Sequence, residues 1–320
     1  MMTRRSVLHS VFAASALAQG RIGPAPHETG PKVFRDYDQV ELDAMYDQAA
    51  YAPNQQQITS RFFTNSELVQ ARLGIPMRFT YGPSKIERLD VYVTPGKKAP
   101  VNIFIHGGAW RSGSASAYGF PAEAFVAAGS HFVVPDFVAV QDAGGDLNAM
   151  AQQVLRAIAW VHRNAARFGG DPDRVFISAH SSGAHLGGVA VTTDWRKDFD
   201  LPQDLIKGAL LVSGLYDLRG PRLSSRSSYV KFDDATEEAL SPQRHLDKLH
   251  VPLIVAWGSL DTPEFQRQSR DFAEAVKTAG KPVEQIEGEG YNHFEFVETL
   301  GNPYGLLGRA ALRQMKLGKS

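Results

Sequence analysis

The 320-residue sequence contains no cysteine, so a disulfide, a catalytic thiolate and a cysteine-based zinc site are all excluded. It also lacks an excess of charge of either sign, because 34 lysine and arginine residues balance 34 aspartate and glutamate residues. The absence of a net positive charge argues against a nucleic-acid partner. No glycine- and serine-rich linker, charge block or repeat divides the chain, and we therefore expect one domain with an N-terminal extension.

Several ligand-binding motifs are missing as well, among them a phosphate-binding glycine loop and a dinucleotide fingerprint. The glycines of "AGGD" at 143–146 form too short a group to indicate more than a turn before a helix. His180 and His185 lack the i, i+4 spacing and the third ligand of a zinc site. We therefore expect no metal and no cofactor, and a small molecule as the partner; the sequence leaves the oligomeric state open.

Residues 1–18 resemble an export signal. The stretch "TRRSVL" (Thr3–Leu8) is similar to a twin-arginine signal, an apolar segment follows from Val7 to Ala18, and its final "ALA" fits a cleavage site. The apolar segment is too short to span a bilayer. We expect a periplasmic or secreted protein whose mature chain begins near Gln19; if the segment is not a signal, the protein is cytoplasmic.

Short apolar runs alternate with helical segments over most of the remaining chain, which favours an α/β fold with a mostly parallel sheet and helices on both faces. Apolar residues at 147, 150, 154, 158, 161, 165 and 168 have helical spacing. The expected strands are 77–81, 88–93, 101–105, 131–135, 175–178, 208–212, 251–257 and 283–286, the first two forming an antiparallel pair. The expected helices are 36–50, 66–73, 122–128, 147–168, 264–279 and 294–316, and 217–248 forms an excursion above the sheet.

The stretch "FISAHSSGAHLGG" (Phe176–Gly188) contains the candidate nucleophile. A nucleophilic serine at a sharp strand-to-helix turn needs small residues two positions before and two after it. Ser181 meets this requirement with Ala179 and Gly183, whereas Ser178 and Ser182 would place a bulky residue in the crowded position. The helix that follows would direct its N-terminal dipole toward a developing negative charge.

A second motif, "HGGAW", directly follows the strand expected at 101–105. An acyl-transfer enzyme needs backbone N–H groups that point at the oxyanion, and glycines let the chain turn so that they do. We expect the amides of Gly108, Ala109 and Ser182 to be the donors and Gly107 to permit the turn.

A catalytic serine also needs a base and an acid that orients the base. Asp261 falls just after the strand expected at 251–257, and Glu264 remains an alternative acid three residues later. His293 follows the last expected strand, in a loop before the final helix, and is the preferred base. His180 and His185 are rival bases, but the side chain of His180 should point away from Ser181, and His185 should pack on its helix or form a local hydrogen bond.

Six segments together resemble the kynurenine formamidase-like branch of the α/β-hydrolases, which is similar to hormone-sensitive-lipase-type esterases. They are HGGAW at 106–110, the turn at 179–183, "SGLYDL" at 213–218, "LSPQRHL" at 240–246, "DTPEFQRQS" at 261–269 and "GYNHF" at 290–294. The resemblance covers roughly residues 75–317, with Ala179 in place of the family's usual glycine. Together with the export signal expected at 1–18, we therefore expect a helical extension at 19–74 and an α/β-hydrolase domain at 75–320.

The resemblance implies serine hydrolysis with Ser181, His293 and Asp261 in their expected roles. We expect a serine esterase that cleaves small carboxylic esters through an acyl-enzyme. An aryl-formamide, amide or carbamate hydrolase with the same residues is the alternative, and a non-catalytic binding protein on this scaffold is a third hypothesis. Four aromatic residues are candidates for the wall of an apolar substrate pocket: Trp110, Tyr118, Phe137 and Tyr216. Of these, Trp110 is expected to contact the substrate beside the oxyanion amides.

Overall fold

The structure, a computed structural model, describes residues 23, 24 and 26–317. The expected export segment lies outside the described residues. Within them, no helix is both long enough and apolar enough to cross a lipid bilayer.

Eight strands form one mixed sheet in the order β1-β2-β4-β3-β5-β6-β7-β8. The pairs β1–β2 and β2–β4 are antiparallel and all later pairs are parallel, which confirms the expected fold class and the leading antiparallel pair. The strands are β1 (Met77–Thr80), β2 (Arg88–Tyr92), β3 (Ala99–Ile105), β4 (His131–Pro135), β5 (Gly170–His180), β6 (Ile206–Val212), β7 (Leu253–Gly258) and β8 (Val283–Gly288).

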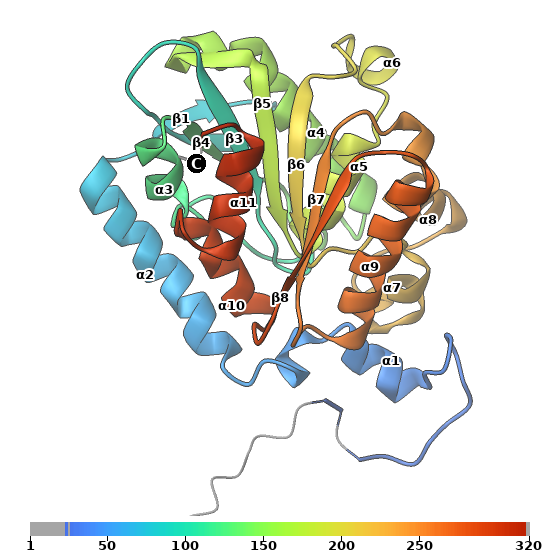
Figure 1. The fold of residues 1–320 in the computed structure, drawn as a ribbon. Helices are drawn as coiled ribbons and strands as arrows, with labels where there is room; N and C mark the ends of the chain where they lie inside the picture. Colours follow the sequence, from blue (N-terminus) through green and yellow to red (C-terminus); the bar gives the residue numbers. More distant parts are fainter. Residues whose placement is uncertain (1–22, 25, 318–320) are drawn as a thin grey trace, which may run out of the picture.

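Helices cover both faces of this sheet (Figure 1). Alternate side chains of each central strand enter opposite cores, as the two-residue period of a strand requires. In β3, Ile103 and Ile105 join the core shared with α1, α4, α5 and α9, whereas Phe104 joins the core shared with α2, α3, α10 and α11. The helices that contribute to these two cores include α1 (Gln39–Met45), α2 (Gln55–Leu73), α3 (Ala122–Ala127), α4 (Leu147–Asn164), α5 (Ser182–Val191), α9 (Pro263–Thr278), α10 (His293–Glu298) and α11 (Leu306–Gln314).

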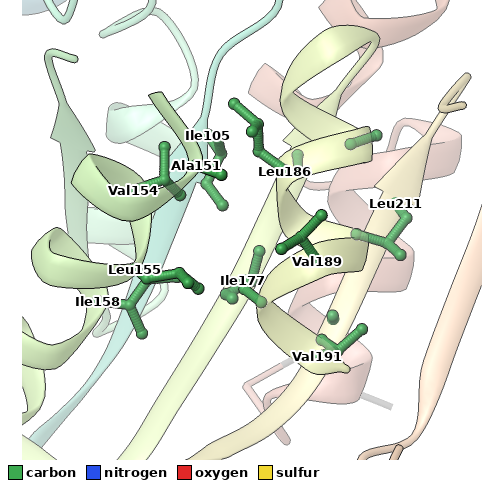
Figure 2. Close-up of a cluster of buried hydrophobic side chains, with 14 of the residues drawn as sticks. Ile105, Ala151, Val154, Leu155, Ile158, Ile177, Leu186, Val189, Val191 and Leu211 are labelled. Atoms are coloured by element: carbon green, nitrogen blue, oxygen red, sulfur yellow. The ribbon is translucent and has the colours of Figure 1, made fainter. Parts of the chain in front are cut away.

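The central part of the first core lies between helices α4 and α5 and the sheet beneath them (Figure 2). Val154 and Ile158 of α4 face Ile177 of β5, and Leu186 and Val189 of α5 complete the layer. All five side chains are at least nine-tenths buried. This apolar layer fixes where β5 ends and α5 begins.

The excursion at 217–248 contains only short elements, as its lack of periodicity indicates. They are α7 (Arg219–Leu223), η3 (Ser225–Ser228), α8 (Asp234–Ala239), η4 (Pro242–Arg244) and η5 (Leu246–Lys248), and α6 (Trp195–Phe199) lies before β6.

Three expected helices were wrong in extent. The segment expected at 36–50 is α1, which begins only after the N-terminal capping box of Asp38, followed by the 3-10 turn η1 (Gln48–Ala50), which Asp47 caps separately. Helix α2 begins at Gln55 rather than at residue 66. The helix expected at 294–316 is interrupted after η6 (Thr299–Gly301), where Pro303 cannot donate a helical hydrogen bond, and resumes as α11.

The turn between β5 and α5 is held by close contact with the end of β3. A Cβ atom on Gly183 would collide with the carbonyl oxygens of Ile105 and His106, so only glycine fits there. The extra methyl group of Ala179 is accommodated because α5 carries Gly187 opposite it; a Cβ on Gly187 would lie 3.1 Å from the Ala179 methyl. The missing glycine at 179 is thus offset by a glycine on the helix.

We predict that Gly183→Ala lowers the free energy of unfolding by about 3 kcal/mol or more. This is the top of the range that overpacking usually costs, because the new Cβ would clash with backbone atoms that cannot easily move. Gly30→Ala is the matched control, since its new Cβ would meet nothing closer than 3.7 Å. Urea denaturation of both variants checks the prediction. Equal stability of Gly183→Ala and the wild type would contradict this account of the turn.

Candidate active site

Three of the expected site residues form one hydrogen-bonded chain. The hydroxyl of Ser181 donates to Nε2 of His293 over 2.8 Å, and Nδ1 of His293 donates to Oδ1 of Asp261 over 3.1 Å. Ser181 follows β5, Asp261 follows β7 and His293 follows β8, and the carboxyl ends of parallel strands meet at one edge of the sheet. All three side chains are buried. The arrangement is able to transfer the serine proton to the imidazole.

Backbone geometry aims the Ser181 side chain. The residue has φ 57° and ψ −126°, a conformation that L-residues rarely adopt, and its amide donates to the carbonyl of Val212 over 2.8 Å. This strained corner places the hydroxyl above the sheet edge and makes Ser182 the first residue of α5.

Asp261 is held by two further donors. Its Oδ2 accepts from the hydroxyl of Ser213 over 2.6 Å and from the amide of Gly258 over 3.1 Å. These bonds fix the carboxylate so that its other oxygen faces His293. The sequence reasoning missed Ser213 as a supporting residue, although the "SGLYDL" motif begins with it.

Glu264, the alternative acid, is directed elsewhere. Its two carboxylate oxygens accept a bidentate pair of bonds from Arg267, at 2.8 and 2.7 Å, and one oxygen also accepts from the hydroxyl of Tyr46. Asp261 is therefore the carboxylate that contacts His293.

The two rival histidines are engaged in other contacts. His180 donates from Nε2 to the carbonyl of His293 over 2.9 Å, and burial together with the nearby His293 ring holds its pKa well below the usual value. His185 accepts from the indole of Trp110 and donates to the carbonyl of Leu240; burial lowers its pKa to about 4. Neither ring contacts the Ser181 hydroxyl, as the sequence reasoning expected.

The HGGAW loop places free amides beside Ser181. Gly108, Ala109 and Trp110 have positive φ values, of 125°, 54° and 63°, so the backbone forms a tight turn over these three residues. A Cβ on Gly107 would lie 2.9 Å from Cβ of Ser181, which explains the glycine at that position.

Among the described residues, the amides of Gly108 and Ala109 donate to no protein acceptor, and the Ser182 amide, in the first turn of α5, has no intrahelical acceptor. The expected donor set is thus present at one place.

Trp110, which the sequence placed beside the substrate, lies in the interior. Its side chain is only 2% exposed and does not line the cavity, and its indole N–H donates to Nδ1 of His185 over 3.2 Å. Phe137 stacks on His106 at 4.2 Å and Tyr216 stacks on Phe272 at 4.1 Å, so both belong to the interior as well. Of the four expected aromatic residues, only Tyr118 lines the cavity.

The cavity that contains Ser181 and His293 has a volume of about 460 Å³, within the range of small-molecule sites. Apolar side chains from α2 and from the start of α10 form much of its wall, with Phe62, Phe63 and Phe294 among them. The segment from Tyr46 to Ala49 closes another side. The N-terminal extension therefore supplies part of the site, which its sequence does not indicate.

Hydrogen bonds attach this extension to the residues around the site. Thr262 donates to the carbonyl of Met45 over 2.6 Å, and Asn292 donates to Asn54 over 2.9 Å. Asn292 also caps the helix that begins with His293. The wall of the cavity and the sheet edge that carries Ser181 and His293 are thus parts of one packed unit.

Comparison with known proteins agrees with this geometry. A family model described as BD-FAE matches residues 89–211. The chain is 32% identical to a kynurenine formamidase of Danio rerio over 252 residues, which cover 76% of this chain and 82% of the relative. It is 30% identical to esterase LipQ of Mycobacterium tuberculosis, covering 62% of this chain and 52% of that protein.

Solved structures show the same fold. A putative thioesterase from Silicibacter sp. TM1040 superposes with a TM-score of 0.74 at 21% identity, covering 85% of this chain and 98% of that one. The esterase Est2 of Thermogutta terrifontis gives a TM-score of 0.61 at 23% identity, covering 76% and 91%. With the relatives above, these matches lead to one conclusion: the chain is a hydrolase and belongs to the α/β-hydrolase esterase group that includes the kynurenine formamidases.

Proposed function

We propose that this protein is a serine hydrolase that cleaves small carboxylic esters through an acyl-enzyme on Ser181. The observation that carries the proposal is the continuous chain of hydrogen bonds from Ser181 through His293 to Asp261, at the wall of a largely apolar cavity. Such an arrangement activates a hydroxyl that is otherwise a weak nucleophile.

In the proposed reaction, His293 removes the proton from Ser181 as its oxygen attacks the acyl carbon. The amides of Gly108, Ala109 and Ser182 stabilise the oxyanion, and Asp261 stabilises the imidazolium. His293 then protonates the leaving alcohol. A water molecule, deprotonated by the same histidine, releases the acid and restores Ser181.

An aryl-formamide, amide or carbamate substrate is the second candidate. The similarity to the kynurenine formamidases of Danio rerio and Salmo salar, at 32% and 34% identity, favours it. The same residues would serve, except that His293 would protonate an amine.

We also propose that the protein is periplasmic or secreted. The support for this location is the export-like segment at Thr3–Leu8.

We predict that Ser181→Ala loses covalent labelling by a fluorophosphonate probe and that its kcat on a 4-nitrophenyl ester falls on the order of 10⁴-fold or more. Ser182→Ala is the matched control: it keeps the label, because the role proposed for that residue rests on its backbone amide. Gel fluorescence and ester assays measure both variants. Absence of labelling in a folded wild-type protein would instead favour a non-catalytic binding protein.

Three substrates, of which phenyl butyrate and butyranilide share the same acyl group, separate the two candidate functions. We predict that phenyl butyrate has a larger kcat/KM than butyranilide and than formanilide, since departure of a phenolate depends much less on protonation by His293 than departure of an anilide does. The assay follows release of phenol or aniline by chromatography, with Ser181→Ala as the blank. A larger kcat/KM for formanilide would reverse the order of the two candidates.

A further inference from the structure

A buried positive charge lines the same cavity. Arg226, in the 3-10 turn η3, has a side chain only 5% exposed, yet it borders the space that contains Ser181. Its Nη2 donates to the carbonyl of Tyr46 over 2.9 Å and its Nη1 to the hydroxyl of Tyr229 over 3.2 Å. Both partners are neutral, and Nε has no partner within the described residues.

In the described part of the chain, no carboxylate lies within 4.0 Å of this guanidinium. Aromatic rings surround it instead, those of Trp110 at 5.1 Å, Tyr46 at 5.9 Å and Phe265 at 6.0 Å from Cζ. Cation–π contacts stabilise the charge in part, but they supply neither a counter-ion nor hydrogen-bond acceptors. A buried charge without a counter-ion is expensive, so its retention calls for a reason.

Gln48 gives a second, independent observation. Its side chain is 7% exposed and lines the cavity, and neither its amide nitrogen nor its carbonyl oxygen has a hydrogen-bond partner among the described residues. A buried amide left unpaired destabilises the folded state. Gln48 lies two residues after Tyr46, whose carbonyl accepts from Arg226, so the two polar groups come from adjoining segments.

Asp47, between these residues, also lines the cavity, but it forms no ion pair with the arginine among the described residues. Its side chain is exposed, and its carboxylate accepts from the amide of Ala49 over 3.0 Å as a helix cap. Within the polar part of the cavity, Arg226 and Gln48 are the buried side chains that offer unpaired donors, whereas Phe62, Phe63 and Phe294 offer an apolar wall.

We infer that Arg226 and Gln48 form a subsite for a carboxylate carried by the substrate, a role that rests on the proposed hydrolase function. A planar carboxylate accepts hydrogen bonds from guanidinium and amide N–H groups together, and it supplies the counter-ion that Arg226 lacks on the protein. The substrate class is thus an ester or amide with an anionic group on one side of the scissile bond and an apolar body.

Two pairs of substrates test the inference, one for each side of the scissile bond. Mono-4-nitrophenyl adipate is compared with its methyl ester, and 3-carboxyphenyl butyrate with 3-carbamoylphenyl butyrate. In at least one pair, we expect kcat/KM for the anionic member to exceed that of the neutral member by about tenfold or more, as charge-assisted bonds in a buried site allow. Similar values within both pairs would overturn the inference.

Variants identify the residues responsible. Arg226→Met should remove the preference, so that kcat/KM for the anionic substrate falls about tenfold more than that for the neutral one, and Arg226→Lys should restore part of it. Arg167→Met, on the exposed turn η2 (Ala165–Phe168), is the charge-matched control and should leave the ratio unchanged. Equal loss on both substrates in Arg226→Met would mean that Arg226 only anchors the segment at Tyr46.

Gln48→Leu keeps the test decisive if Arg226→Met fails to fold. We expect this variant to melt at a higher temperature, because it removes an unpaired buried amide, and to show a smaller anionic preference. An unchanged preference in Gln48→Leu would remove Gln48 from the subsite. If the wild type hydrolyses the neutral esters and takes the fluorophosphonate label but shows no anionic preference, the subsite fails while the proposed function stands. Absence of labelling would overturn both.

Discussion

The sharp corner at Ser181 is the constraint on which the rest of the site depends. A residue at φ 57° and ψ −126° persists only where its surroundings fix it, and here the core between α4, α5 and the sheet does so from one side. From the other side, β3 approaches so closely that only glycine fits at 183. Because the corner fixes the hydroxyl, His293 and the free amides of the HGGAW loop need only be positioned around one point.

The parallel strands position these groups, because each site residue follows within a few residues of the end of its strand. Asp261 follows β7 and His293 follows β8, so the register of the sheet, rather than any contact between the loops alone, brings the two side chains together. Ser213, at the end of β6, adds the bond that orients Asp261. The N-terminal extension then closes the cavity and contributes Gln48, and the excursion after β6 contributes Arg226.

Much of this arrangement is readable from sequence, because local patterns encode it. Buried apolar runs mark the strands, and the small residues around Ser181 mark the corner. What depends on tertiary contact is not readable. Trp110 follows the glycines of the HGGAW loop yet turns inward to His185, and no local pattern shows that Gln48 lines the cavity. The early start of α2 and the break near Pro303 were likewise missed, since packing and a single proline outweigh average helical composition.

The most direct test of the account is a crystal structure of the protein after reaction with a 4-nitrophenyl alkylphosphonate. We expect the phosphorus to be bonded to the side-chain oxygen of Ser181 and the phosphoryl oxygen to lie within about 2.7–3.1 Å of amides from the HGGAW loop and Ser182. Phosphorus on another residue, or a phosphoryl oxygen turned away from those amides, would contradict the account.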